Sequence, residues 1–201
     1  MKDGCRMCVN VGDVFYRASK QSKYEVIPIS SHIIRTIRGE LGYLYMGDII
    51  WHKITNTHAT GGASVMGSYP YPRNGCVSID YEHILLFKKA GTPPSISESK
   101  KNESQMTKEE WRGYFSSIWS VPGERHTKHP ASYPIEIPTR LIKMFSFKGE
   151  TVLDPFVGSG TTSLAAMLQG RNSIGYDIQT EYESVIRERF SEVCNESNTA
   201  I

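Results

Sequence analysis

The chain has 201 residues, with 23 Lys and Arg against 21 Asp and Glu and a formal net charge of +2 at pH 7. This length fits one domain, or one domain with an insertion, and the near-balanced charge excludes a global basic field for nucleic acid. No apolar run approaches the ~18 residues needed to cross a membrane and no signal peptide opens the chain, so we expect a cytoplasmic protein.

The cysteines do not complete a metal site. Cys5 and Cys8 have the spacing of a metal-binding or redox pair, but Cys76 and Cys194 form no second pair. Residues 9–11 continue as a strand pattern, whereas a redox pair should open a helix. We therefore expect no metal, and we expect Cys5 and Cys8 to be core residues.

In the first half of the chain, residues 5–11 form an apolar run that predicts a buried parallel strand. Residues 14–24 predict a mixed loop. A helix should follow, capped by Ser30 or Ser31 and ended by Gly42. Its core-facing stripe consists of Ile33, Ile34, Ile37 and Leu41.

Two further strands are predicted at residues 48–51 and 83–87. Between them, residues 54–75 are rich in Thr, Gly, Asn, Tyr and Pro, a composition that suits a functional loop or lid. Residues 91–108 are polar, so we expect them to be mobile. An aromatic-rich amphipathic stretch at 111–119 follows.

A basic loop at residues 123–130 leads to a helix at 135–145, with Pro138 in its first turn. Leu141, Ile142 and Phe145 should lie on its core side. At the end of the chain, residues 181–194 predict a charged helix and 195–201 a frayed tail.

Residues 151–177 predict a strand–turn–helix–strand unit with an acid after each strand. A buried strand at 151–153 ends on Asp154, a helix runs from Thr161 to Gly170, and a second strand at 173–176 ends on Asp177. Glycines in the turn let the backbone approach a ligand, and the helix start offers unpaired N–H groups. An acid ~20 residues further on typically binds ribose hydroxyls.

Three other interpretations of this glycine turn do not match its residues. A phosphate-binding P-loop needs a Lys after its last glycine, where Thr161 and Thr162 stand. A nucleophile elbow needs Gly-x-Ser-x-Gly, and Gly158-Ser159-Gly160 is too short. The dinucleotide motif needs Gly or Ala at Ser163. An ordinary strand–helix turn remains the alternative.

The string Asp-Pro-Phe-x-Gly-Ser-Gly-Thr-Thr at residues 154–162 resembles the S-adenosylmethionine-binding motif of amino-group DNA methyltransferases, which modify cytosine N4 or adenine N6. Three other segments resemble the subgroup whose catalytic half precedes its cofactor half. Residues 8–13 resemble the strand after the catalytic motif, and residues 50–53 resemble a Trp-x-Lys strand near the base pocket. Residues 129–134 resemble the segment that packs over the methionine part of the cofactor.

The resemblance implies an α/β fold with a Rossmann-like methyltransferase sheet and helices on both faces. It divides the chain into residues 1–90 (catalytic region, C-terminal part), 91–128 (mobile segment and target recognition) and 129–201 (cofactor region). The implied cofactor is S-adenosyl-L-methionine, and the implied cofactor-binding residues are Pro130, Ala131, Asp154, Pro155, Phe156, Gly158, Ser159, Gly160, Thr161, Thr162, Asp177 and Ile178.

Within that set the resemblance assigns roles by the parts of the cofactor. The backbone amides of residues 158–160 and the start of the helix would approach the amino-acid end. Asp154 would face the ammonium group or a water molecule, and Phe156 would give an apolar wall. Asp177 would take the ribose hydroxyls. Ile178 would pack on adenine or, alternatively, in the core.

Double-stranded DNA is the implied partner, and the target base would be flipped out of the stack. Trp51 is a candidate for the base pocket, with core packing as the alternative, and Lys53 lies beside it in the same strand. Sequence recognition would fall in residues 55–74 and 91–124. Candidates for phosphate contact, each otherwise a solvated charge, are Lys53, Arg73, Lys88, Lys89, Arg125 and Lys128.

The sequence departs from the family in its catalytic motif, which is Ser, Asn or Asp followed by Pro-Pro and an aromatic residue. This motif is absent; Thr92-Pro93-Pro94-Ser95 lacks the aromatic residue. The strand that carries it should lie between residues 5–11 and 151–153, so we expect a gap in the sheet, with unpaired backbone groups. We therefore expect an N-terminally truncated chain, with no catalytic residues of its own.

The favoured function is methyl transfer to an exocyclic amine of a DNA base in a restriction-modification system, at cytosine N4 rather than adenine N6. The alternative is an inactive or split-enzyme fragment that binds cofactor or DNA and needs an upstream partner chain for catalysis. A third hypothesis is a small-molecule or RNA methyltransferase.

Overall fold

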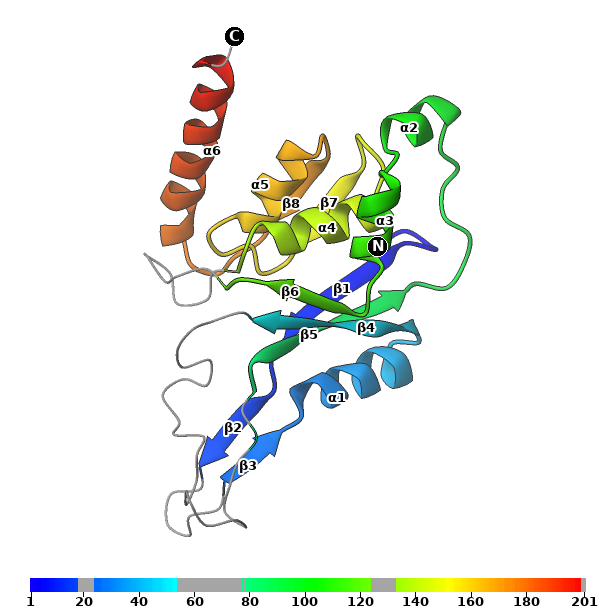
Figure 1. The fold of residues 1–201 in the computed structure, drawn as a ribbon, viewed down its shortest axis with the longest axis vertical. Coiled ribbons are helices and arrows are strands. Elements are labelled where there is room, and N and C mark those ends of the chain that lie inside the picture. The colour runs from blue at the N-terminus through cyan, green and yellow to red at the C-terminus, as the bar shows by residue number, and fades with distance from the viewer. Residues whose placement is uncertain (18–23, 54–76, 78, 124–132, 200–201) are drawn as a thin grey trace. The chain divides into compact units, whose positions relative to one another are not determined.

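A computed structural model describes residues 1–17, 24–53, 77, 79–123 and 133–199 of the chain. The chain divides into two compact units (Figure 1). Unit 1 comprises Met1–Ser95 and Ser116–Pro122, and unit 2 comprises Ile96–Phe115 and Gly123–Ile201. None of the helices in the described ranges is long and apolar enough to cross a membrane.

Unit 1 contains a mixed four-stranded sheet of order β1-β5-β4-β6. Its strands are β1 (Arg6–Val11), β4 (Leu44–Lys53), β5 (Tyr81–Lys88) and β6 (Ile118–Val121). β5 runs antiparallel to β1 and β4, whereas β6 pairs parallel with β4. Because β5 is an inner strand, Ile84 and Leu85 are both buried although they point to opposite faces. The predicted strands at 48–51 and 83–87 are confirmed as parts of β4 and β5.

Two expectations for the start of the chain are wrong. The apolar run at residues 5–11 forms β1, but its described pairing is antiparallel and most of its side chains are only half-buried. An apolar run indicates burial, not the direction of the neighbouring strand. The expected loop at 14–24 begins with a strand, β2 (Val14–Arg17), which pairs antiparallel with β3 (Tyr24–Ile27), and β3 starts at the last residue of that range. Each strand has four residues, too few to show a clear alternation.

The predicted first helix exists and ends at Gly42 as predicted, since Leu41 is its C-cap residue and Gly42 has a φ of 72°, but its start differs from the prediction. It consists of α1 (Ile29–Ile34) and a π-helical continuation, η1 (Arg35–Glu40). Neither serine caps it: Pro28 is the N-cap residue, and the backbone N–H of Ser30 donates to Asp13 Oδ1 at 3.0 Å. The wider π turns shift the expected apolar stripe, so Leu41 is exposed rather than facing the core.

Unit 2 contains a two-stranded parallel sheet and five helices among its described residues. The strands are β7 (Thr151–Asp154) and β8 (Asn172–Gly175). The helices are α2 (Glu98–Glu103), α3 (Lys108–Tyr114), α4 (Glu136–Phe145), α5 (Thr161–Leu168) and α6 (Glu181–Thr199). Ile142 of α4 and Ala165 and Ala166 of α5 form a core with the half-buried Ile135 and Val152. The predicted helices at 135–145 and 161–170 and the predicted strand at 173–176 are confirmed.

Two expectations for unit 2 are wrong, and two stretches contain elements that were not predicted. The polar stretch at 91–108 contains α2, whose N-cap Ser97 accepts from the Lys100 amide, and its expected mobility stays a prediction. The aromatic stretch at 111–119 divides between α3 and β6. The strand at 151–153 is not buried, since Leu153 is exposed. The expected frayed tail is helical as far as Thr199.

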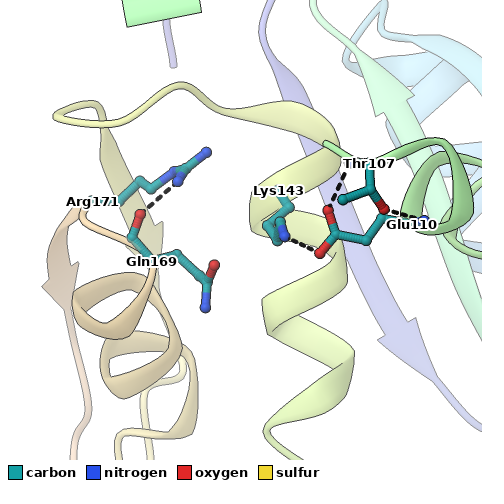
Figure 2. Close-up of polar contacts among 5 residues, drawn as sticks. All are labelled: Thr107, Glu110, Lys143, Gln169 and Arg171. Atoms are coloured by element: carbon teal, nitrogen blue, oxygen red, sulfur yellow. Dashed lines mark hydrogen bonds and ion pairs between the residues drawn. The ribbon is translucent and has the colours of Figure 1, made fainter. Parts of the chain in front are cut away.

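Helix α3 starts with a reciprocal cap and is joined to α4 by an ion pair (Figure 2). The Glu110 amide donates to Thr107 Oγ1 at 3.1 Å, and the Thr107 amide donates to Glu110 Oε2 at 3.0 Å. The other carboxylate oxygen of Glu110 accepts from Lys143 of α4. The hydrogen bond from Lys143 lowers the pKa of Glu110, so the pair stays charged at neutral pH. One carboxylate thus caps a helix and fixes its neighbour.

Arg171, shown in Figure 2, is buried at the end of α5, with 6% of its surface exposed. It donates to Gln169 O at 2.5 Å, Ser146 O at 2.7 Å and Ser146 Oγ at 3.2 Å. Ser146 is the C-cap residue of α4, and Gln169 is the C-cap residue of α5. Carbonyl groups at helix C-termini carry partial negative charge, so two helix ends balance one buried cation.

We predict that Arg171→Met destabilises the protein by about 2–4 kcal/mol, because it removes three hydrogen bonds and leaves half-buried acceptors unpaired. Urea unfolding followed by circular dichroism measures the change. Arg187→Met is the matched control, since Arg187 is an exposed residue of α6 paired with Glu183, and it should change stability little. Equal stability of the two variants would contradict a structural role for Arg171.

Candidate cofactor site

The predicted cofactor residues meet at the carboxyl ends of β7 and β8. The two strands are parallel, and Asp154 lies opposite Gly175 in the register. Asp177 follows two residues after Gly175. The carboxyl ends of adjacent parallel strands are where open α/β sheets bind their ligands. The two acids therefore lie at the end of the sheet where a ligand is expected.

The turn between β7 and α5 is held by its own backbone and by Asp154. Asp154 Oδ1 accepts from the Phe156 amide at 3.0 Å, and the Val157 amide donates to Tyr176 O at 2.9 Å. Gly160 occupies the N-cap of α5 with φ of 82°, in the left-handed region. A Cβ there would also come within 2.9 Å of Ile186 in α6, so the position requires glycine.

Asp177 joins the turn to the end of β8. Its Oδ2 accepts from the Gly158 amide at 2.9 Å, and its Oδ1 accepts from the Gln179 amide at 2.9 Å. An ionised carboxylate offers about four acceptor positions, so about two remain for O–H donors such as ribose hydroxyls. The two described hydrogen bonds orient the Asp177 carboxylate and leave acceptor positions on it for a ligand.

Two large apolar side chains in the segments that follow β7 and β8 are open to solvent. Phe156 is 86% exposed and Ile178 is 98% exposed. For Ile178 this exposure rules out the alternative of core packing within the described residues. Both residues are therefore accessible to a ligand at the ends of the two strands. Each flanks a hydrogen-bonded acid, Asp154 or Asp177.

A chain of hydrogen bonds runs from Tyr133 through Thr162 to Asp154. Thr162 Oγ1 donates to Asp154 Oδ2 at 2.5 Å and is also bonded to the Tyr133 hydroxyl. Since a threonine hydroxyl has one proton, Tyr133 must be the donor in its bond. Burial raises the pKa of the Tyr133 phenol to about 12, so it keeps that proton at neutral pH.

The structure thus adds two residues to the predicted site. Tyr133 lies within the segment 129–134 that the family resemblance marks, but its sequence position does not reveal its contact with Thr162. Arg189 of α6 bonds Ser159 and Thr161. Its helix is recognisable from sequence only as charged, because a contact across 30 residues leaves no local pattern.

Unit 2 brings together Asp154, Pro155, Phe156, Gly158, Ser159, Gly160, Thr161, Thr162, Asp177 and Ile178. Pro130 and Ala131 lie outside the described residues. The same holds for three of the proposed phosphate contacts, Arg73, Arg125 and Lys128.

The proposed base-pocket residues lie in unit 1. Trp51 is buried with 3% of its surface exposed, and its Nε1 donates to Val121 O at 2.9 Å, as core packing predicts. Lys53 lies 5.1 Å from the centre of the Trp51 ring and pairs with Glu82. Glu82 also accepts from Asn10 Nδ2 at 2.6 Å.

The two described lysines at the end of β5 differ in their contacts. Lys89 pairs with Asp3 at 3.0 Å, which raises its pKa, and it also donates to Met1 O. Lys88 is the last residue of β5 and is half-buried. A phosphate would have to compete with a carboxylate at Lys53 and at Lys89, so these two are weaker candidates than the sequence predicts.

Cys5 and Cys8 are free and half-buried. Burial raises the pKa of the Cys8 thiol to about 12, so it stays protonated and unreactive. Within the ranges that the structure describes, no group of three His, Cys, Asp or Glu residues could hold a metal ion.

We predict that Tyr133→Phe and Thr162→Val are energetically coupled, because Thr162 transmits the bond from Tyr133 to Asp154. A double-mutant cycle in urea should give a coupling of about 1 kcal/mol. Thr162→Ser, which keeps the hydroxyl, serves as the control and should retain most of the coupling to Tyr133. Additive effects of Tyr133→Phe and Thr162→Val would contradict the chain of bonds.

The chain is similar to known type II DNA methyltransferases. The chain is 38% identical over 190 residues to the type II methyltransferase M.MjaI of Methanocaldococcus jannaschii, covering 90% of the chain and 60% of M.MjaI. It is 34% identical over 206 residues to M.MthZI of Methanothermobacter thermautotrophicus, covering 96% of the chain and 56% of M.MthZI. The chain therefore spans less than two thirds of the length of these relatives.

Solved structures show the same fold. The putative DNA modification methylase TTHA0409 of Thermus thermophilus, crystallised with S-adenosyl-L-methionine, superposes with a TM-score of 0.79 at 31% identity, covering 94% of this chain and 70% of that one. The cytosine-N4-specific PvuII DNA methyltransferase superposes with a TM-score of 0.64 at 18% identity, covering 92% of this chain and 63% of that one, a likeness of fold alone. These similarities confirm the predicted α/β, Rossmann-like methyltransferase fold. Residues 1–188 match the family described as DNA methylase, N6_N4_Mtase, and the chain belongs to that family.

Proposed function

We propose that this chain binds S-adenosyl-L-methionine at the ends of β7 and β8 and serves as the cofactor-binding part of a DNA methyltransferase of the restriction-modification type. The observation that carries the proposal is Asp177, oriented by two backbone amides with acceptor positions left over, beside the exposed side chains of Phe156 and Ile178. A nucleoside needs this combination of an acid for ribose and apolar surface for its base.

The residues of the candidate site would contact different parts of the cofactor. Asp177 would accept from the ribose hydroxyls, and Ile178 and Phe156 would cover apolar surface of the ligand. Asp154 already accepts from Phe156 and Thr162, so it first shapes the turn, and its remaining acceptor positions face the ammonium group or a water molecule. Pro130 and Ala131 stay predictions for the methionine part.

The amino-acid end of the cofactor would meet backbone amides at the start of α5. The Gly158 amide is used by Asp177, and the Gly160 amide donates to Val157 O at 2.8 Å. Helix starts leave their first N–H groups without intrahelical partners, and these favour a carboxylate. When bound, S-adenosyl-L-methionine supplies an activated methyl group on its sulfonium.

The acceptor would be an exocyclic amine of a flipped DNA base. Of the two amines that the family modifies, we propose cytosine N4 rather than adenine N6. Residues 1–90 would supply part of the base-binding region, residues 91–128 target recognition and residues 129–201 cofactor binding. Of the three described candidates for phosphate contact, we propose Lys88, because carboxylates already pair with Lys53 and Lys89.

A second candidate function is a fragment that binds cofactor or DNA and needs a partner chain for catalysis. The 201 residues contain no Ser, Asn or Asp followed by Pro-Pro and an aromatic residue. Among the described strands, β1 pairs only with β5 and β7 pairs only with β8. Of the strands that the structure describes, β1 and β7 thus each have one edge at which a further strand could be added.

We predict that Asp177→Ala weakens S-adenosyl-L-methionine binding by about 10- to 150-fold, since hydrogen bonds to a charged group contribute about 1.5–3 kcal/mol. Isothermal titration calorimetry measures the affinity. Leu153→Ala is the control, because Leu153 is exposed in the same strand pair but precedes the site, and it should bind as wild type does. Equal binding by Asp177→Ala and wild type would contradict the ribose contact.

The second candidate function predicts that the protein transfers radiolabelled methyl groups from S-adenosyl-L-methionine to DNA only together with a partner chain that carries the Ser/Asn/Asp-Pro-Pro-aromatic motif. The proposed choice of base predicts that digestion of the DNA to nucleosides yields N4-methylcytosine. N6-methyladenine as the product would overturn the choice of base. Transfer by the chain alone would refute the need for a partner. Transfer to RNA in preference to DNA would refute the proposed substrate.

A further inference from the structure

We propose that Arg189 is a positioning residue for the amino-acid end of the cofactor, acting by holding the turn at residues 159–161 from the side of α6. The inference rests on the proposed function of the site. Arg189 itself need not touch the cofactor.

One nitrogen of the Arg189 guanidinium group serves three acceptors in this turn. Nη1 donates to Ser159 O at 2.7 Å, to Ser159 Oγ at 3.0 Å and to Thr161 Oγ1 at 3.1 Å. A planar, permanently charged guanidinium group can hold several oxygens in one fixed arrangement, which a flexible ammonium group cannot. The peptide group after Ser159 and the first residue of α5 are therefore fixed by the same side chain.

A second contact from α6 lies one helical turn earlier. Ile186 approaches Gly160 so closely that a Cβ at Gly160 would come within 2.9 Å of Ile186 Cγ1. Residues three apart lie on the same face of a helix, so Ile186 and Arg189 form one surface of α6. That surface contacts each of the residues Ser159, Gly160 and Thr161.

These contacts change the roles of the hydroxyl groups in the motif. Ser159 and Thr161 use theirs to accept from Arg189, and Thr162 uses its own to donate to Asp154. Thr161 is buried, with 3% of its surface exposed. All three hydroxyls thus take part in shaping the turn, and the backbone amides at the start of α5 add N–H donors for a carboxylate.

The charge of Arg189 supports the same conclusion. Its three acceptors are neutral oxygens, so no bonded carboxylate cancels the cation through these contacts. The N-terminus of α5 adds partial positive charge at the same place. Both effects favour the carboxylate of the amino-acid end, and neither acts on the adenosine part.

Because both effects favour the amino-acid end and not the adenosine part, two ligands that differ in having that end test the proposal. S-adenosyl-L-methionine and 5′-methylthioadenosine share adenine, ribose and sulfur, but only the first has the amino-acid end. We predict that Arg189→Met weakens S-adenosyl-L-methionine binding by about 10- to 30-fold and 5′-methylthioadenosine binding by less than about 3-fold, measured by calorimetry. Arg189→Lys should restore part of the loss, since one ammonium group can replace some of the contacts.

Arg187→Met is the matched control on the same helix. Arg187 is exposed and paired with Glu183, so this variant should bind both ligands as wild type does. Thermal unfolding of each variant in the presence and absence of ligand shows whether it is folded. If Arg189→Met does not fold, the comparison of Arg189→Lys with wild type carries the test.

The outcomes separate the two proposals. Unchanged binding of both ligands by folded Arg189→Met, or an equal loss for both, would overturn the positioning role and leave the proposed function standing. Failure of the wild-type protein to bind either ligand would overturn the proposed function, and the inference with it. A selective loss for S-adenosyl-L-methionine with partial rescue by Lys supports the inference.

Discussion

The hydrogen bond from the Gly158 amide to Asp177 is the interaction on which the candidate site depends. It joins the turn after β7 to the segment after β8 at 2.9 Å and sets the direction of the carboxylate. The bond is possible because β7 and β8 are parallel neighbours whose ends, Asp154 and Gly175, lie in register. The pairing of two strands thereby fixes the geometry of the candidate site.

Most polar side chains of the motif at residues 154–162 hold the backbone of the turn in place. Asp154, Ser159, Thr161 and Thr162 all have partners within the protein, supplied by the turn itself, Tyr133 and Arg189. What stays open is the surface of Phe156 and Ile178, part of Asp177 and the amides at the start of α5. A site built in this way is oriented before any ligand arrives, which reduces the ordering that binding costs.

Sequence reasoning succeeded where the signal is local. Strand β8, helices α4 and α5 and the placement of Asp154 and Asp177 follow from short-range patterns of apolar residues, Gly and Pro. Sequence reasoning failed where the structure of a segment depends on the elements that pack against it. The antiparallel partner of β1, the pairing of β2 with β3 and the exposure of Leu153 depend on which strands meet, and no local pattern records that.

The sequence alone determined the family motif, the α/β fold class and the order of the two acids, because close spacing in the chain enforces closeness in space. Only the tertiary structure decided that Trp51 is buried against Val121, that Lys53 is paired with Glu82, and that Tyr133 and Arg189 hold the turn. These contacts join residues about 30 or more positions apart, and hydrogen bonds at that separation form only once the elements have packed.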